Sequence, residues 1–216
     1  MVFRSLGPNP HLAKEIVQRA FEYYFYAAPA KEPVVKIVRP IRWSKPIAGW
    51  LKLNTDGSSL ENPGLAGGGG LIRNEEGGWG AGFARKIGIT TSFLAELWAL
   101  RDGLSLCVNR SILAVDVELD AKSIVDAIVN PNYSNIFASA LLDDCRHLIQ
   151  QIPQVRFKHC FREANRCADA LARMGGLLED DFTVFESPPV DISVLLEFDS
   201  KGLYMNRLCP ASLLEL

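Results

Sequence analysis

The order of strand and helix patterns along the chain predicts an α/β fold, with a mixed sheet of about five strands and helices on its faces. Three successive stretches between residues 50 and 90 have strand character and are separated by turns, which is typical of an antiparallel meander. Beyond residue 90, helical periodicity alternates with two more strand patterns. The chain has 216 residues, 48% of them hydrophobic and 22% charged, so it can bury the core of one such domain.

The first strand begins at Leu51, where Leu51 and Leu53 alternate with polar neighbours. It presents Asp56 at its end, and Gly57 and Ser58 follow as a turn. A carboxylate at the end of a central strand, beside a glycine that lets a large ligand approach the backbone, is a natural position for a metal-binding or catalytic acid. Aspartate before glycine is also ordinary turn chemistry, so the remaining acids decide between these interpretations.

The meander continues through two more strands. A turn at residues 62–64 precedes a strand at 67–74, and a hairpin turn at 75–78 leads into a strand at 79–87. The four glycines that open the second strand are compatible with close approach of another backbone. This glycine run lacks the GxxxxGK[ST] pattern and does not open a helix, which argues against a nucleotide-phosphate loop.

The second half alternates helices with strands. Its elements are expected at residues 91–108 (helix), 113–120 (strand), 122–129 and 136–151 (helices), 155–159 (strand) and 165–174 (helix). Thr91 or Ser92 is suited to cap the first of these helices. Gly175 and Gly176 are suited to end the last one as a C-cap.

Three regions are expected along the chain. Residues 1–49 are interpreted as an N-terminal helix at about residues 10–26 and a Pro-containing linker, whose Trp43, with the adjoining Trp50, can dock onto the core. Residues 50–176 form the compact domain, and residues 177–216 an acidic, partly ordered tail. The aromatic stretch at residues 21–26 can stack on bases, but a packing face is the more common role of such a stripe.

Charge is unevenly distributed, although the net charge is only −2. Eight Lys and Arg against three Asp and Glu give +5 for residues 1–50, while residues 51–176 carry −1 and residues 177–216 carry −6. If cations neutralise four acids of the middle region that are candidates for metal binding, Asp56, Glu96, Asp120 and Asp169, the charge of that region becomes +3. Such a charge suits a nucleic-acid phosphate backbone, and solvated surface charge is the alternative explanation.

Cysteine usage and hydropathy indicate an intracellular protein. The five cysteines are odd in number, widely spaced and without a CxxC pair, which favours buried reduced thiols over disulfides or a zinc site. The sequence contains no run of about 18 apolar residues and no signal-peptide core. We therefore expect no membrane partner and a soluble protein of the nucleus or cytoplasm that is not secreted.

Four acids occupy distinct places in this expected fold. Asp56 and Asp120 end two strands, Glu96 lies early in a helix, and Asp169 lies in the last helix of the domain. If the two strands are parallel neighbours, their ends bring two carboxylates together at one edge of the sheet. Helices packed against that edge can add the other two.

The motifs around these acids resemble ribonuclease H type 1, and in particular the ribonuclease-H-like domains common in plants, many of them retroelement-derived. The matching text is TDGS at 55–58, NPG at 62–64, AEL followed by AL at 95–100, LD at 119–120 and REANRCADALAR at 162–173. The likeness covers about residues 50–176. It implies the ribonuclease-H-like fold, with a mixed five-stranded sheet and helices on its faces.

This resemblance implies an endoribonuclease that hydrolyses the RNA strand of RNA–DNA hybrids, acting as a monomer. Asp56, Glu96, Asp120 and Asp169 would be its catalytic residues and the ligands of two Mg2+ or Mn2+ ions, hard cations that prefer oxygen ligands. Asp56 would bridge both ions, with Glu96 and Asp120 on one ion and Asp169 on the other, for an in-line displacement. Glu96 would also reach the ribose 2′-hydroxyl, which distinguishes RNA from DNA.

The resemblance also implies a set of nucleic-acid-binding residues. They are Gly57, Ser58, Asn62, Thr91, Arg162 and Asn165. Asn62 and Thr91 would hold the nucleic-acid backbone, although Asn62 also fits an ordinary Asn-Pro-Gly turn. Asn165 fits helix capping as well as substrate contact, and Arg162 fits a phosphate contact or a charge stabiliser.

The chain departs from the family pattern at several positions. Ser92 and Phe93 replace the asparagines that usually precede the glutamate, and Ala121 replaces the serine that usually follows the third acid. His159 has the offset of a mobile catalytic histidine but falls at the end of a strand, where a structural role is more common. The interval between Asp120 and Asp169 is short for the basic protrusion of some bacterial members.

Two other functions remain compatible with these observations. One is a catalytically weak nucleic-acid-binding module of retroelement origin, which the altered residues 92, 93 and 121 favour. The other is a protein-interaction role carried by the flanking segments at residues 21–26 and 192–196. Three outcomes distinguish these functions. Metal-dependent cleavage of a hybrid supports the enzyme, salt-sensitive binding without cleavage supports the binding module, and absence of nucleic-acid affinity leaves the protein-interaction role.

Overall fold

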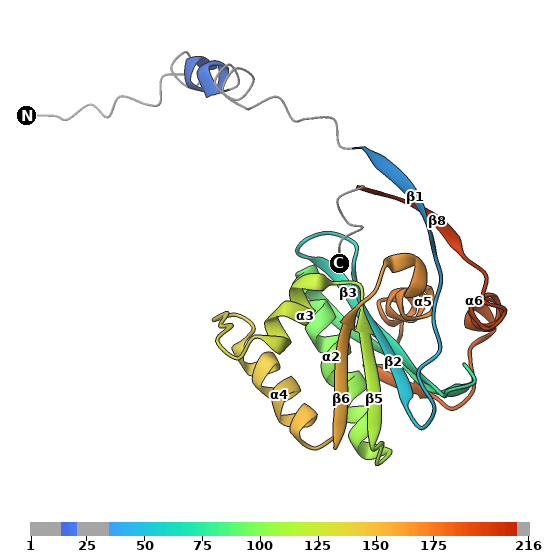
Figure 1. Ribbon diagram of the computed structural model, residues 1–216. Helices are drawn as coiled ribbons and strands as arrows, with labels where there is room; N and C mark the ends of the chain where they lie inside the picture. Colours follow the sequence, from blue (N-terminus) through green and yellow to red (C-terminus); the bar gives the residue numbers. More distant parts are fainter. Residues whose placement is uncertain (1–13, 21–34, 211–216) are drawn as a thin grey trace, which may run out of the picture. The chain divides into compact units, whose positions relative to one another are not determined.

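The computed structural model describes residues 14–20 and 35–210 (Figure 1). Residues 14–20 form an exposed helical segment within the expected N-terminal helix, while the aromatic stretch at 21–26 lies outside the described residues. The chain divides into two units, residues 1–39 with 208–216 and residues 40–207. Strands β1 (Lys36–Ile41) and β8 (Met205–Pro210) pair in a two-stranded sheet of their own.

The main sheet has six strands in the order β6-β5-β2-β3-β4-β7. Their bounds are Leu51–Ser59 for β2, Gly64–Arg73 for β3, Trp79–Thr90 for β4, Ala114–Leu119 for β5, Gln154–His159 for β6 and Phe182–Phe185 for β7. β2, β3 and β4 form the expected antiparallel meander, and β5 runs parallel to both β2 and β6. The sheet is therefore mixed, as the sequence predicts, with β7 as the strand beyond the expected five.

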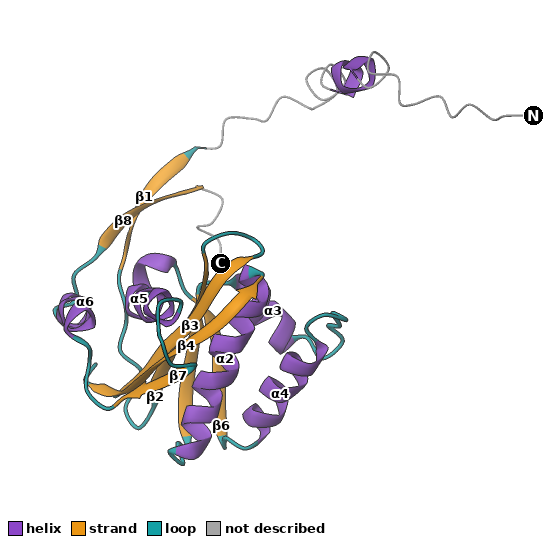
Figure 2. Cartoon of the chain, turned by 180° about the vertical axis from the view of Figure 1, so that it is seen from behind, coloured by secondary structure: helices purple, strands orange, loops and turns teal. Residues whose placement is uncertain are grey.

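Helices cover both faces of this sheet (Figures 1 and 2). One face carries α2 (Ser92–Asn109), α3 (Lys122–Val129) and α4 (Ser139–Gln150), and the other carries α5 (Arg166–Gly175) and α6 (Val190–Ser200). A large apolar cluster fills the first face, and a smaller one around Leu71, Leu171 and Ile192 fills the second. A 3-10 turn, η1 (Arg162–Ala164), leads into α5.

The glycine run of β3 allows helix α5 to contact the sheet backbone. A Cβ atom on Gly69 would lie 2.3 Å from the backbone nitrogen of Ala172. Gly68 points to the opposite face, where a Cβ would lie 3.3 Å from the Cβ of Ala99 in α2. The expectation of close backbone approach is thus confirmed, and the approaching element is a helix of the same chain.

Helix α5 ends at Gly175 and has Gly176 as its C-cap residue, as expected. Gly176 has a φ of −63°, so the cap does not use the left-handed conformation that favours glycine. A Cβ on Gly175 would instead lie 2.4 Å from the carbonyl oxygen of Arg85. Close packing of α5 on β3 and β4 is the physical reason for glycine at this position.

Parts of both flanking regions belong to the main fold. Trp43 from the expected linker is buried, and the guanidinium of Arg73 lies 3.6 Å from the centre of its ring. Trp50 contacts the Arg156 guanidinium at 3.7 Å, so both tryptophans dock as expected. Within the region expected as a partly ordered tail, residues 182–185 contribute β7 to the sheet and residues 190–200 contribute α6 to its second face.

All five cysteines lie in the described part of the chain as free thiols, and four of them are buried. The burial of four thiols agrees with the expectation of buried cysteines. Among the described helices, none combines the length and the apolar composition that crossing a bilayer requires.

We predict that Gly69→Ala destabilises the fold by about 1–3 kcal/mol, the usual cost of overpacking, because the added methyl group meets the α5 backbone. Gly68→Ala is the matched control, since its methyl group would approach no atom closer than 3.3 Å, against 2.3 Å at Gly69, and should cost less. Urea unfolding of the two variants measures the difference. Equal stability of both variants would contradict the assignment of Gly69 to the α5 contact.

Candidate active site

The register of β2 and β5 places Asp56 beside Asp120. These parallel strands pair Asn54 with Glu118, so the residues two positions further along each strand lie at the same level. Those residues are Asp56, inside β2, and Asp120, directly after β5. The expectation that the strand ends at Asp56 with Gly57 and Ser58 as a turn is wrong, because β2 continues to Ser59 by pairing with β3. Because the side chains of a strand alternate between its faces, both carboxylates emerge on the same side of the sheet.

Gly57 allows helix α2 to bring Glu96 to the same point. A Cβ on Gly57 would lie 2.1 Å from the backbone nitrogen of Glu96, so any other residue would push the helix away. The backbone N–H of Gly57 also donates a hydrogen bond to the Glu96 carboxylate. The sequence suggested that this glycine lets a ligand approach the backbone; in the structure helix α2 approaches it. Direct contact of Gly57 with nucleic acid stays a prediction.

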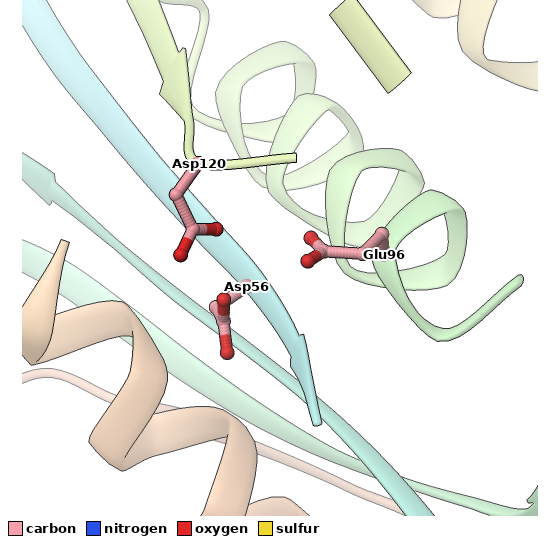
Figure 3. Close-up of side chains that lie close together, drawn as sticks. All are labelled: Asp56, Glu96 and Asp120. Carbon is pink, nitrogen blue, oxygen red and sulfur yellow. The ribbon is translucent and has the colours of Figure 1, made fainter. Parts of the chain in front are cut away.

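Asp56, Glu96 and Asp120 form one compact group, with a carboxylate oxygen of each within 4.8 Å of the others (Figure 3). Asp56 and Glu96 are buried and Asp120 is partly exposed, so the group opens to solvent on one side. In the described part of the chain, Oε2 of Glu96 is buried without a hydrogen-bond partner. Such an oxygen can bind a cation without losing an existing hydrogen bond.

Burial and the crowding of negative charge raise the pKa values of Asp56 and Glu96. Burial, together with the charges of Asp120 and Asp169, raises the pKa of Asp56 to about 8. Burial also raises the pKa of Glu96 well above its usual range, and the charges of Asp56 and Asp120 add to the effect. These carboxylates therefore ionise together at neutral pH only when positive charge lies beside them.

Asp169, the fourth expected metal ligand, lies outside this compact group. Its carboxylate pairs with Arg162 at 2.6 Å and with Arg173 at 2.9 Å. Its charge still contributes to the raised pKa of Asp56, so it faces the same region. The structure brings three of the four acids together and holds the fourth in ion pairs with two arginines.

The donor set fits a hard divalent cation. Three carboxylates from β2, α2 and the end of β5 converge, and one of their oxygens is buried without a partner. Mg2+ and Mn2+ prefer oxygen ligands of this kind and relieve the repulsion among them. The residues therefore match divalent metal binding, with neither the ion nor the number of ions specified by the cluster.

Asn62 and Thr91 organise the start of helix α2. Thr91 Oγ1 accepts a hydrogen bond from the Leu94 amide, which confirms Thr91 as the N-cap. Asn62 Oδ1 accepts one from the Ser92 amide and so ties the turn after β2 to the helix. A groove of about 470 Å³ lies here, lined by Asn62, Thr91, Ser92, Phe93, Leu94, Asn135, Phe137 and Ala138.

Asn165 and His159 each contact the backbone of a strand that leads to the acidic group. Asn165 is buried and makes no side-chain cap; its Nδ2 donates to the Thr55 carbonyl at 2.9 Å, and its contact with substrate stays a prediction. His159 ends β6 as expected, and its exposed ring has Nε2 3.1 Å from the Asp120 carbonyl oxygen; its structural role also stays a prediction. Ser58 lines a separate apolar pocket together with Arg173.

Sequence reasoning missed Asn135 and Phe137 in the groove and Arg173 at Asp169. The stretch NPNYSN at 130–135 is a surface-loop signal between two helices, and binding residues are common in such loops. Arg173 is four residues after Asp169 on the same helix, a spacing that favours ion pairs.

The geometry and the comparisons with known proteins agree on the family. Residues 54–175 match the sequence profile described as "Reverse transcriptase-like", which covers more than half of the chain. The chain belongs to this family, and its expected likeness to ribonuclease H type 1 is confirmed.

Individual relatives support the same assignment. The chain is 37% identical over 167 residues to the Arabidopsis thaliana "Putative ribonuclease H protein At1g65750". The match covers 77% of this chain and 27% of that relative, so the chain spans about a quarter of the relative's length.

Solved structures share the fold. The N-terminal ribonuclease H domain of a Mycobacterium tuberculosis protein superposes with a TM-score of 0.56 at 25% identity, over 59% of this chain and 93% of that one. LC11 ribonuclease H1, solved in complex with an RNA/DNA hybrid, gives a TM-score of 0.53 at 28% identity, over 57% of this chain and 94% of that one.

We predict that, with chelator present, the free energy of unfolding falls as the pH rises from about 4 to about 8. Over this range folded Asp56 keeps its proton whereas unfolded Asp56, with a pKa of about 4, loses it. Asp56→Asn cannot ionise, so it should flatten this dependence and exceed wild type in stability at pH 8. Urea unfolding at a series of pH values measures both effects.

Asp126→Asn is the control, because Asp126 is exposed on helix α3 and pairs with Lys122 at 2.8 Å. It should keep the wild-type slope. A slope that Asp56→Asn leaves unchanged would show that the raised pKa of Asp56 does not govern the pH dependence of stability.

Proposed function

We propose that this chain is a divalent-metal-dependent endoribonuclease that hydrolyses the RNA strand of RNA–DNA hybrids. The observation that carries the proposal is the convergence of Asp56, Glu96 and Asp120, with one carboxylate oxygen of each within 4.8 Å of the others beside the inner strands β2 and β5. Family membership and the likeness to LC11 ribonuclease H1, solved with an RNA/DNA hybrid, support the choice of substrate.

In this proposal the carboxylates bind two Mg2+ or Mn2+ ions. Bound ions of this kind activate a water molecule and stabilise the leaving oxygen of a phosphodiester. Asp56 is central, because it belongs to the compact group with Asp120 and Glu96 and its pKa is also raised by the charge of Asp169. Asp169 completes the set once its carboxylate exchanges an arginine partner for a cation.

Glu96 would select RNA over DNA. Its carboxylate lies on α2 above the strand end, with one buried oxygen that has no partner among the described residues. A ribose 2′-hydroxyl can donate a hydrogen bond to a carboxylate, and DNA lacks this group.

The nucleic-acid backbone would contact both sides of the acidic group. On one side lies the groove that contains Asn62 and Thr91. On the other side Arg162 and Arg173, with about three fifths of each side chain exposed, offer positive charge beside Asp169. Arginine forms paired hydrogen bonds with phosphate, so Arg162 can hold a phosphate while Asp169 holds a cation.

The proposal treats the protein as an intracellular monomer. All three clustered carboxylates come from one chain, so no second copy is needed to build the site. Five free cysteines suit a reducing compartment.

A catalytically weak binding module is the second candidate. The ion pairs of Asp169 with Arg162 and Arg173 favour it, since they compete with metal binding. Phe93 in the groove beside α2 favours it as well, because it replaces a polar residue of the family pattern.

The decisive experiment compares cleavage of a labelled RNA–DNA hybrid with duplex RNA and duplex DNA, in Mg2+, Mn2+ or chelator. We expect the RNA strand of the hybrid alone to be cut, and only with metal. Asp56→Asn and Asp120→Asn should each lower the rate by more than about a hundredfold, since even outer contacts of metal ligands are worth about 10- to 100-fold.

Asp126→Asn, an exposed change six residues after Asp120, should keep the wild-type rate. Hybrid binding that weakens with salt, without cleavage in either metal, would replace the enzymatic proposal by the binding module. A folded wild type that neither binds nor cleaves the hybrid would reject both.

A further inference from the structure

A line of buried polar side chains joins helix α6 to the strand that carries Asp56. Asp199 of α6 accepts an ion-paired hydrogen bond from Arg73 of β3 at 2.7 Å, and both side chains are at most 4% exposed. Arg73 then donates a second hydrogen bond to Asn54 Oδ1 at 2.9 Å. One guanidinium therefore connects α6 to β2 across β3.

Donor chemistry fixes the direction of the next contacts. Trp43 Nε1 also donates to Asn54 Oδ1, at 3.0 Å. Because arginine and tryptophan only donate, Asn54 must turn its oxygen toward them and its amide nitrogen away. That nitrogen donates to Asn165 Oδ1 at 3.2 Å.

The last contact reaches the acidic group. With its oxygen engaged by Asn54, Asn165 directs its Nδ2 to the Thr55 carbonyl, at 2.9 Å. This carbonyl belongs to the peptide bond that enters Asp56. The backbone carbonyl of Asn165 also accepts the first helical hydrogen bond of α5, from the Asp169 amide at 3.0 Å.

We propose that Asp199, Arg73, Asn54 and Asn165 form a positioning relay, which holds the Asp56 backbone and the start of α5 in the arrangement that metal binding requires. The inference rests on the proposed function. A buried ion pair often adds little to the free energy of unfolding. The Arg73–Asp199 pair instead fixes the orientation of the Asn54 and Asn165 side chains.

The relay extends the functional unit beyond the family domain. Asp199 and Trp43 lie outside residues 54–175, the part that the family profile matches. The flanking segments would thus act on the site through Arg73, whose guanidinium touches both.

The test uses the full chain and two relay variants. Asn165→Ala removes the contact with Thr55, and Arg73→Met combined with Asp199→Leu replaces the ion pair by apolar groups that can restore packing. Calorimetric titration with Mg2+ should show binding weaker by about tenfold or more in both, the usual effect of losing support for a metal ligand. On hybrid, kcat should fall more than KM rises.

A second measurement does not need metal. In chelator, hydrogen exchange of residues 54–58 should be faster in both variants than in wild type, because the Thr55–Asp56 peptide has lost its support. Trp43→Phe keeps the ring against Arg73 but removes the N–H donor, and it should shift both readouts in the same direction if the double variant does not fold.

Asp102→Asn is the matched control. Asp102 is as buried as Asp199 and pairs with Arg85 and Arg101, neither of which belongs to the relay. It should lower the unfolding free energy without changing Mg2+ affinity or exchange at residues 54–58.

Folded relay variants that match wild type in both Mg2+ affinity and exchange would overturn the relay. Failure of the proposed function would look different, because wild type itself would then neither bind Mg2+ nor cleave the hybrid. Exchange in chelator would still decide whether the relay supports Asp56.

Discussion

Parallel pairing of two neighbouring strands is the constraint on which this structure depends. The register of β2 and β5 sets Asp56 and Asp120 side by side, and burial raises the cost of keeping both ionised. Nearby positive charge reduces this repulsion. In the structure the charge of Arg162 offsets part of the rise in the pKa values of Asp56 and Glu96, and a divalent cation would offset more of it.

Close approach of backbones delivers the remaining groups. Gly57 admits helix α2 with Glu96, and Gly69 admits helix α5 with Asp169, each at a distance that a side chain would prevent. Buried polar contacts run from Asp199 through Arg73 and Asn54 to Asn165, which holds the Thr55 carbonyl next to Asp56. Trp43 and Asp199, which lie on either side of the family domain in the sequence, both contact Arg73. Small residues and buried polar contacts together set the geometry of the site.

Local patterns predicted most elements because they depend on neighbouring residues. Alternation found β2, and helical periodicity with Thr91 found α2. Patterns failed where distant contacts decide. β7 needed the edge of β4 to pair with, and the close packing of Gly175 on the backbone of β3 and β4 could not be read from the sequence.

The sequence by itself determined the fold class, the family and the four acids, because motif order and hydrophobic period are local properties of the chain. Only the tertiary structure decided how these acids lie. It gathers Asp56, Glu96 and Asp120 but gives Asp169 two arginine partners, and it buries Asn165 against the Thr55 carbonyl. Distances between side chains more than a hundred residues apart follow from strand register and helix packing, which no local pattern encodes.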